Sequence, residues 1–144
     1  MEKIALIDIT EGQSFYIGTL TLSEDDIIKF AIANDPLDFH INREAAMKSV
    51  FKGFVASGSQ VFSVLHKTGW IPMFGHSVIC GLELNNWKFI KPVYANMPVS
   101  GNVIIKTIKK NEEKHHAVIT WRYEFKDNKN EFVQTLEVTV LHKI

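Results

Sequence analysis

The sequence predicts an α+β protein in which one long buried helix is covered by a curved, mostly antiparallel sheet. Helical patterns fill the first half of the chain, and strand-like runs separated by charged turns fill the second half. An apolar run with small residues begins near Gly58 and suits a closely packed central helix. With 144 residues, 46% of them hydrophobic, the chain is expected to form a single domain spanning residues 1–144.

The first half begins with a predicted strand and a capped helix. Ser14 to Leu22 is rich in aromatic and β-branched residues, which favours an extended segment. Ser23 precedes a run of acidic residues, so we expect it to cap a helix, with Asp26 in the place of the glutamate of a capping box. The residue before Pro36 is disfavoured in the α region, so this helix should end there.

Two more helices are predicted before the sheet. Asn42 is expected to cap a short helix that runs from Arg43 to Ser49. The central helix should open near Gly58 and stop near Thr68 and Gly69.

The second half has the alternation and turns of an antiparallel meander. Gly81 interrupts the first of its strands and predicts a bulge or a close approach. The predicted strands are Ser77–Phe89, Val99–Lys109, Ala117–Phe125 and Phe132–Leu141.

Charge and composition exclude several classes of protein. Basic and acidic residues both number 16, so there is no broad basic field for nucleic acid. The single cysteine, Cys80, cannot form an intrachain disulfide. No run approaches the roughly 20 apolar residues of a membrane span, and charge interrupts the N-terminus too early for a signal peptide. We therefore expect a cytoplasmic protein with no nucleic-acid or membrane partner.

The candidate site is the stretch from Asp35 to His40, together with Ser57 and Gly58. Loops bring an acid, an imidazole and a helix-opening glycine to one part of the chain. Taken alone, an aspartate before a proline is often only a helix stop, and a single histidine is often structural. The residues by themselves leave both interpretations open.

Three motifs in order resemble one family. Asp35 is followed five positions later by His40, Phe51–Gly58 reads Phe-Lys-Gly-Phe-Val-Ala-Ser-Gly, and Trp87–Val93 reads Trp-Lys-Phe-Ile-Lys-Pro-Val. Together they resemble the MaoC-like hydratases and dehydratases, which include the R-specific enoyl-CoA hydratases. The resemblance implies the hot-dog fold, in which a curved antiparallel sheet wraps a long central helix.

The resemblance also implies a lyase activity and a site. The expected reaction adds water to a trans-2-enoyl thioester, or removes it from a 3-hydroxyacyl thioester, with acyl-CoA as the expected substrate. Asp35 and His40 would hold the water, and the Gly58 N–H at a helix start would stabilise the enolate oxygen. No cofactor is expected, because the CoA or acyl-carrier thioester is itself the substrate.

Other side chains are weaker candidates. Ser57 and Phe39 are expected at the substrate, Ser57 as a support for the loop because no base partners it as a nucleophile. His66 is a candidate for the acyl pocket, or else a satisfied, partly buried histidine. His76 with Cys80 is too sparse for a zinc site, and we expect no metal.

Two further groups have open assignments. Lys88, Lys91 and Arg43 would either meet the phosphates of a CoA-type carrier or be solvated. The apolar segment from Trp70 to Phe74 would either shape an acyl tunnel or cover the sheet edge.

Two alternative functions also stay open. Asp35 or Asp38 could activate water to hydrolyse a thioester on the same fold. Leu37 and Asp38 depart from the family's commoner pattern, which favours a non-catalytic acyl-thioester-binding subunit as the third possibility. In each case an exposed edge strand predicts a homodimer or a higher oligomer.

Overall fold

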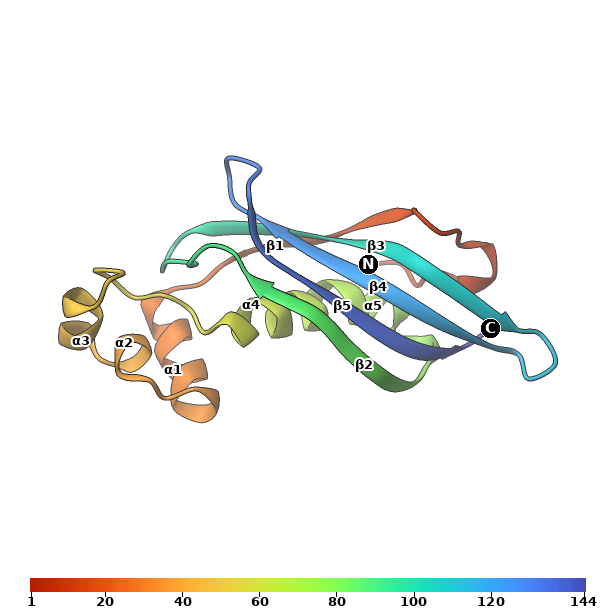
Figure 1. The fold of residues 1–144 in the computed structure, drawn as a ribbon, viewed down its shortest axis with the longest axis horizontal. Coiled ribbons are helices and arrows are strands. Elements are labelled where there is room, and N and C mark those ends of the chain that lie inside the picture. Colours follow the sequence, from red (N-terminus) through yellow and green to blue (C-terminus); the bar gives the residue numbers. More distant parts are fainter.

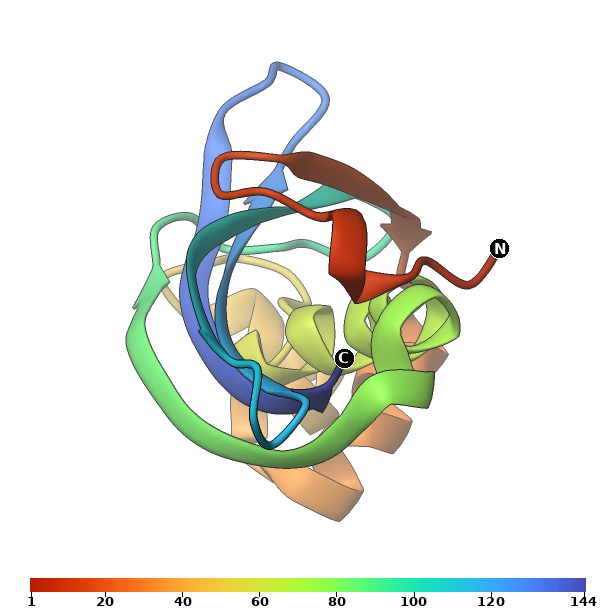
Figure 2. The same ribbon diagram turned by 90° about the vertical axis from the view of Figure 1, so that its right-hand side faces the viewer.

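The computed structural model describes residues 1–144 as one antiparallel sheet curled around a helix (Figures 1 and 2). The five strands lie in the order β1-β3-β4-β5-β2. Seen end-on in Figure 2, the sheet curves around the helical segment. The α+β prediction, with a central helix wrapped by a curved sheet, is confirmed. The strands are β1 (Ser14–Thr21), β2 (Val78–Phe89), β3 (Pro98–Asn111), β4 (His116–Lys126) and β5 (Phe132–Lys143).

Three short helices lie beyond one end of the sheet, at the left of Figure 1. They are α1 (Glu24–Asn34), α2 (Asp38–Ile41) and α3 (Arg43–Lys48). The predicted capping box is present, because Asp26 N donates to Ser23 Oγ at 3.1 Å and Ser23 N donates to Asp26 Oδ2 at 3.0 Å. Asn42 caps α3 as predicted, accepting from Ala45 N at 2.9 Å.

The central helix is longer than the sequence predicts. It begins as α4 (Gly58–Leu65), continues through a π-helical turn η2 (His66–Trp70), and ends as α5 (Ile71–Phe74). The predicted stop near Thr68 and Gly69 is therefore wrong. Gly69 allows close packing instead of ending the helix, since a Cβ there would lie 1.9 Å from the carbonyl oxygen of Ile17 in β1.

The segment from Trp70 to Phe74 places Trp70, Met73 and Phe74 in the core and leaves Ile71 exposed. Trp70 is 2% exposed and Phe74 is fully buried, and both rings contact Trp121 of β4. The buried side chains of this segment therefore pack inside the sheet. The sequence alone leaves two other assignments open for the segment, the wall of an acyl tunnel or a cover for the sheet edge. Two 3₁₀ turns, η1 (Leu6–Asp8) and η3 (Gly75–Ser77), complete the elements.

Strand β4 shows how the sheet divides inside from outside. Its inward residues are almost completely buried, and the residues between them are half-buried on the outer face. This alternation is the one that the sequence predicts. The inward residues are Ala117, Ile119, Trp121, Tyr123 and Phe125.

Strand β2 forms one edge of the sheet. It pairs only with β5, and its register shifts next to Gly81, as predicted for a bulge. Ile79, Leu82 and Leu84 are 42%, 51% and 53% exposed on this strand. The edge therefore presents both unpaired backbone groups and apolar side chains. No helix of the structure has the length and apolar character needed to cross a membrane.

Candidate active site

Asp35 and His40 are placed by the end of α1 and by α2. Asp35 is the C-terminal cap of α1, and its N–H donates to Ala31 O at 2.8 Å before Pro36 turns the chain. Its carboxylate is 36% exposed. His40 lies on α2 and is only 5% exposed. The turn thus sets a half-exposed acid beside a buried imidazole.

A short extended pairing fixes the orientation of the imidazole. Ala56 N donates to Val93 O at 2.8 Å, which holds the chain before α4 against the segment that follows β2. The carbonyl oxygen of Val55 then lies 2.6 Å from His40 Nδ1. Because a carbonyl only accepts, Nδ1 carries the hydrogen, and Nε2 of the neutral ring is left with a lone pair.

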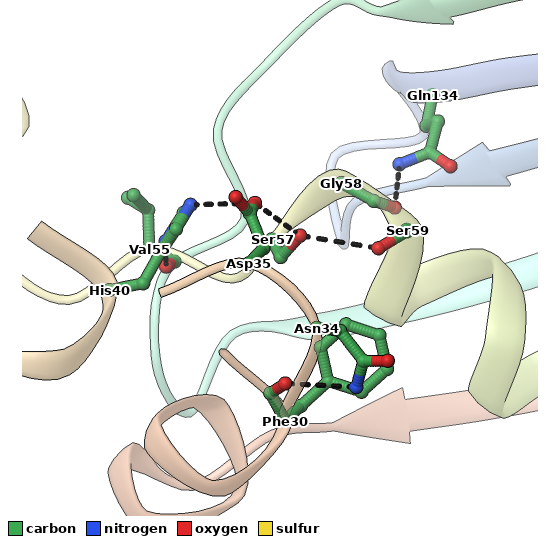
Figure 3. A network of polar contacts seen from close by, with 9 residues as sticks. All are labelled: Phe30, Asn34, Asp35, His40, Val55, Ser57, Gly58, Ser59 and Gln134. Atoms are coloured by element: carbon green, nitrogen blue, oxygen red, sulfur yellow. Dashed lines mark hydrogen bonds and ion pairs between the residues drawn. The ribbon is translucent and has the colours of Figure 1, made fainter. Parts of the chain in front are cut away.

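The acid and the imidazole face each other at the start of α4 (Figure 3). His40 Nε2 lies 3.4 Å from Asp35 Oδ2, which is longer than a usual direct hydrogen bond. Ser57 Oγ donates to the same Asp35 oxygen at 2.7 Å. Ser57 is 2% exposed and is the N-cap residue of α4. Its hydrogen bond therefore holds the Asp35 carboxylate at the N-terminus of the central helix.

Gly58 is the first residue of α4. Its N–H has no acceptor in the helix and forms no hydrogen bond with the rest of the chain, as is usual for donors in a first turn. The ring of Phe89 covers the glycine so closely that a Cβ would lie 2.2 Å from Phe89 Cε1. The Gly58 carbonyl accepts a hydrogen bond from Gln134 Nε2 at 2.9 Å.

A cavity of about 270 Å³ opens beside these groups, and eight of its 13 lining residues are hydrophobic. Its walls include His40, Gly58, Phe39, Phe51, Phe89 and Gln134. The structure thus brings Asp35, His40, Ser57, Gly58 and Phe39 together, as the sequence predicts. Asp35 and Ser57 lie behind the cavity wall and reach it through His40 and the start of α4, whereas Asp38 is exposed at the start of α2 and contacts neither His40 Nε2 nor Ser57.

His66 lies away from the cavity walls. Its Nδ1 is 2.7 Å from Tyr123 Oη, and its ring stacks on Trp70 at a centroid distance of 4.8 Å. Burial lowers the pKa of His66 to about 4. These contacts match the partly buried, satisfied histidine that the sequence left as one of two possibilities.

Stability should therefore depend on pH. Burial lowers the pKa of both His66 and His142 to about 4, from an ordinary value of 6.5. Between these two pH values the unfolded chain binds more protons than the folded chain, so stability is lost as pH falls from about 6.5 toward 4. We expect the free energy of unfolding to drop by roughly 2 kcal/mol for each histidine over this window.

Urea unfolding at a series of pH values measures this loss. The His66→Asn variant keeps an acceptor near Tyr123 but does not titrate, so its stability should change less steeply with pH. His115→Gln, on an exposed turn, is the control and should keep the wild-type dependence. An unchanged pH dependence in His66→Asn would contradict the assignment.

The basic residues near the site already have partners or are exposed. Arg43 pairs with Glu24, and Lys91 pairs with Glu131 and, at 3.5 Å, with Asp127. Lys88 is exposed and makes no ion pair within the chain. No group of three or more His, Cys, Asp or Glu side chains is arranged to hold a metal ion.

Sequence reasoning missed Gln134 and gave Phe89 no role of its own. Gln134 takes an inward position in β5 on the same face as Leu136, and a polar residue at such a core position is the signal that marks it. Phe89 reaches Gly58 from the edge strand β2. A contact between segments so far apart in the sequence leaves no local pattern.

Comparison with known proteins first gives the class of fold. The structure of a MaoC-like dehydratase from Rhodospirillum rubrum is similar over 97% of both chains, with a TM-score of 0.84 and 23% identity. An (R)-hydratase from A. caviae involved in PHA biosynthesis is similar over 93% of this chain and 97% of that chain, with a TM-score of 0.72 and 20% identity. The fold is therefore a hot-dog fold, as the resemblance implies.

The sequence then gives the family. Residues 9–128 match the family model described as "MaoC like domain". The uncharacterized protein YdeM of Bacillus subtilis (strain 168) is 37% identical over 128 residues, which cover 86% of this chain and 90% of that protein. The chain belongs to the MaoC-like domain family.

Proposed function

We propose that this chain is a hydratase or dehydratase that adds water to a trans-2-enoyl thioester or removes it from a 3-hydroxyacyl thioester. An acyl-CoA or acyl-carrier thioester would be the substrate, with no resident cofactor. One observation carries the proposal: His40 Nε2, the Asp35 carboxylate and the unpaired Gly58 N–H lie together beside one mostly apolar cavity. Membership of the MaoC-like family supports the class of reaction.

The pair of Asp35 and His40 is suited to hold one water molecule. With Nδ1–H donated to Val55 O, the neutral imidazole offers only the lone pair of Nε2, and an ionised carboxylate only accepts. Two acceptors 3.4 Å apart are best joined by a molecule with two O–H donors. The oxygen lone pair of such a water is then free to attack C3 of the substrate.

In hydration, the water oxygen forms a bond to C3 as the pair takes one of its protons. The electrons of the C2–C3 double bond move toward the thioester carbonyl, and the pair then delivers a proton to C2. Asp35 and His40 share these proton transfers as a pair. The Gly58 N–H donates to the carbonyl oxygen as charge develops on it, and one such donor contributes on the order of 3 kcal/mol.

The test follows the products formed by purified protein from short-chain and medium-chain enoyl-CoAs. Loss of the enoyl thioester with formation of 3-hydroxyacyl-CoA is the expected result. Release of free CoA without a 3-hydroxyacyl product would show hydrolysis instead. Calorimetric binding of an acyl-CoA without any turnover would identify a non-catalytic subunit, and either outcome would reject the proposal.

We also propose that the chain forms a homodimer through β2. This strand has a free edge, with Ile79, Leu82 and Leu84 exposed along it, and a second copy would pair with it and cover these residues. The same strand ends in Phe89 at the cavity. Dimerisation would therefore bring the second copy close to the site.

Analytical ultracentrifugation tests the dimer and its edge. The wild type should sediment at twice the 16.4 kDa mass of the chain, and Leu84→Lys on β2 should shift it to the monomer. Tyr16→Lys places the same charge on β1, the opposite edge, and should leave the dimer intact. A monomeric wild type, or dissociation by Tyr16→Lys alone, would contradict the proposal.

A further inference from the structure

Gln134 is a buried polar side chain that reaches from β5 to the start of the central helix (Figure 3). It is 2% exposed, and its Nε2 donates to the Gly58 carbonyl oxygen at 2.9 Å. A polar amide loses hydration when it is buried, so it is retained at a core position only where its hydrogen bonds offset that loss. Both ends of the Gln134 amide have a partner in the chain.

The second partner fixes which way the amide points. Trp87 Nε1 on β2 donates to Gln134 Oε1 at 2.9 Å. An indole N–H only donates, so it identifies the oxygen of the glutamine and leaves the NH₂ group for Gly58. Trp87 is itself packed edge-on against Phe62 of α4, with ring centroids 5.5 Å apart.

The last partner in this chain of contacts is Gly58, which has no side chain of its own to restrain its backbone. A glycine at the first helical position has more backbone freedom than any other residue. Anchoring the Gly58 carbonyl fixes the plane of the Gly58–Ser59 peptide and restricts the backbone rotations that set the Gly58 N–H direction. To stabilise an oxyanion, a hydrogen-bond donor has to lie about 3 Å from the position of that oxygen.

We propose that Gln134 is a positioning residue for the Gly58 N–H, and that Trp87 holds Gln134 in the orientation this requires. The proposal rests on the hydratase function, in which that N–H stabilises the thioester oxygen. It assigns to β5 and to the edge strand β2 a part in the geometry of the oxyanion donor. Gln134 acts through Gly58 and takes no proton.

The kinetic test uses Gln134→Met, which keeps the length of the side chain and removes both hydrogen bonds. We expect kcat for enoyl-CoA hydration to fall by about 10-fold to 100-fold, with KM within about 3-fold of wild type, because the lost interaction acts in the transition state. Trp87→Phe keeps an aromatic ring but lacks the indole N–H that orients Gln134, so its kcat should fall by about 3-fold to 10-fold.

Thr139→Val is the matched control, since it removes a side-chain hydrogen bond to Thr120 from the outer face of the same strand. Its kcat should stay within about 2-fold of wild type. The inference is overturned if Gln134→Met retains wild-type kcat, if the loss lies only in KM, or if Thr139→Val loses as much kcat as Gln134→Met.

A measurement that does not depend on activity separates this inference from the proposed function. Amide nitrogen relaxation should show increased motion of Gly58 and Ser59 in Gln134→Met and not in Thr139→Val. If the wild type hydrates no enoyl thioester, the hydratase proposal fails, and the relaxation data alone decide whether Gln134 restrains Gly58. Unchanged order parameters at Gly58 in Gln134→Met would overturn the inference even in an active enzyme.

Discussion

In the His40→Ala variant, kcat for enoyl-thioester hydration should fall by about 1000-fold, the middle of the range for loss of a general acid or base. The imidazole is held from one side by Val55 O, so only Nε2 is free to act on a water. Alanine removes that group, and the other acid on α2, Asp38, is exposed and does not line the cavity. Asp35→Asn should cause a comparable loss, because the amide keeps an acceptor for Ser57 but has no charge. Initial rates with a fixed enoyl-CoA measure both effects.

Asp38→Asn provides the control for these two variants. Asp38 lies three residues after Asp35, but its side chain is exposed at the start of α2 and has no contact with Ser57 or with His40 Nε2. Its rate should stay within about 2-fold of wild type. Full activity in His40→Ala or Asp35→Asn would contradict the catalytic role of the pair. A large loss of activity in Asp38→Asn would identify Asp38 as the catalytic acid in place of Asp35.

The Gly69→Ala variant should have a much lower free energy of unfolding than the wild type. The new Cβ would lie 1.9 Å from Ile17 O and 2.7 Å from Ile17 Cβ, and both η2 and β1 are held at this point by the core. Relief requires the helix and the strand to separate, because no flexible side chain is available to move aside. We expect a loss of about 3 kcal/mol or more, or about 10 °C in Tm.

Gly53→Ala is the matched change at a site with room. A Cβ there would meet only the ring of Tyr94 at 3.7 Å, an ordinary van der Waals distance. Its free energy of unfolding should stay within about 0.5 kcal/mol of wild type. Calorimetry of the two variants side by side makes the comparison, and equal stabilities would refute the close-packing role of Gly69.

Local patterns in the sequence predicted most of the elements. The alternation in β4 and the capping box of Ser23 and Asp26 both appear in the structure, because each depends on residues within one turn or one strand. The predicted end of the central helix, near Thr68 and Gly69, is wrong. Gly69 and Pro72 both resemble helix breakers in the sequence. In the structure, Gly69 allows the helix to pack closely against β1. Pro72 lies in the first turn of α5, where proline is tolerated.

The candidate site was predicted in part for the same reason. Asp35, His40, Ser57 and Gly58 carry a motif with a fixed order, and the structure brings them together. The contacts of Gln134 and Phe89 with Gly58 depend on how β5 and β2 lie across the helix start. Such placements follow from tertiary packing, which periodicity in one segment does not encode.

The π-helical turn at His66–Trp70 also bears on how this chain is aligned with its relatives. A π turn accommodates one residue more than the α-helical turn it replaces. A homologue with an unbroken α-helix would span the same distance with one residue fewer. An alignment of the two sequences therefore needs a one-residue gap after Leu65. Without this gap, a role transferred from a residue of the relative would be assigned to the wrong, neighbouring residue in the rest of the helix.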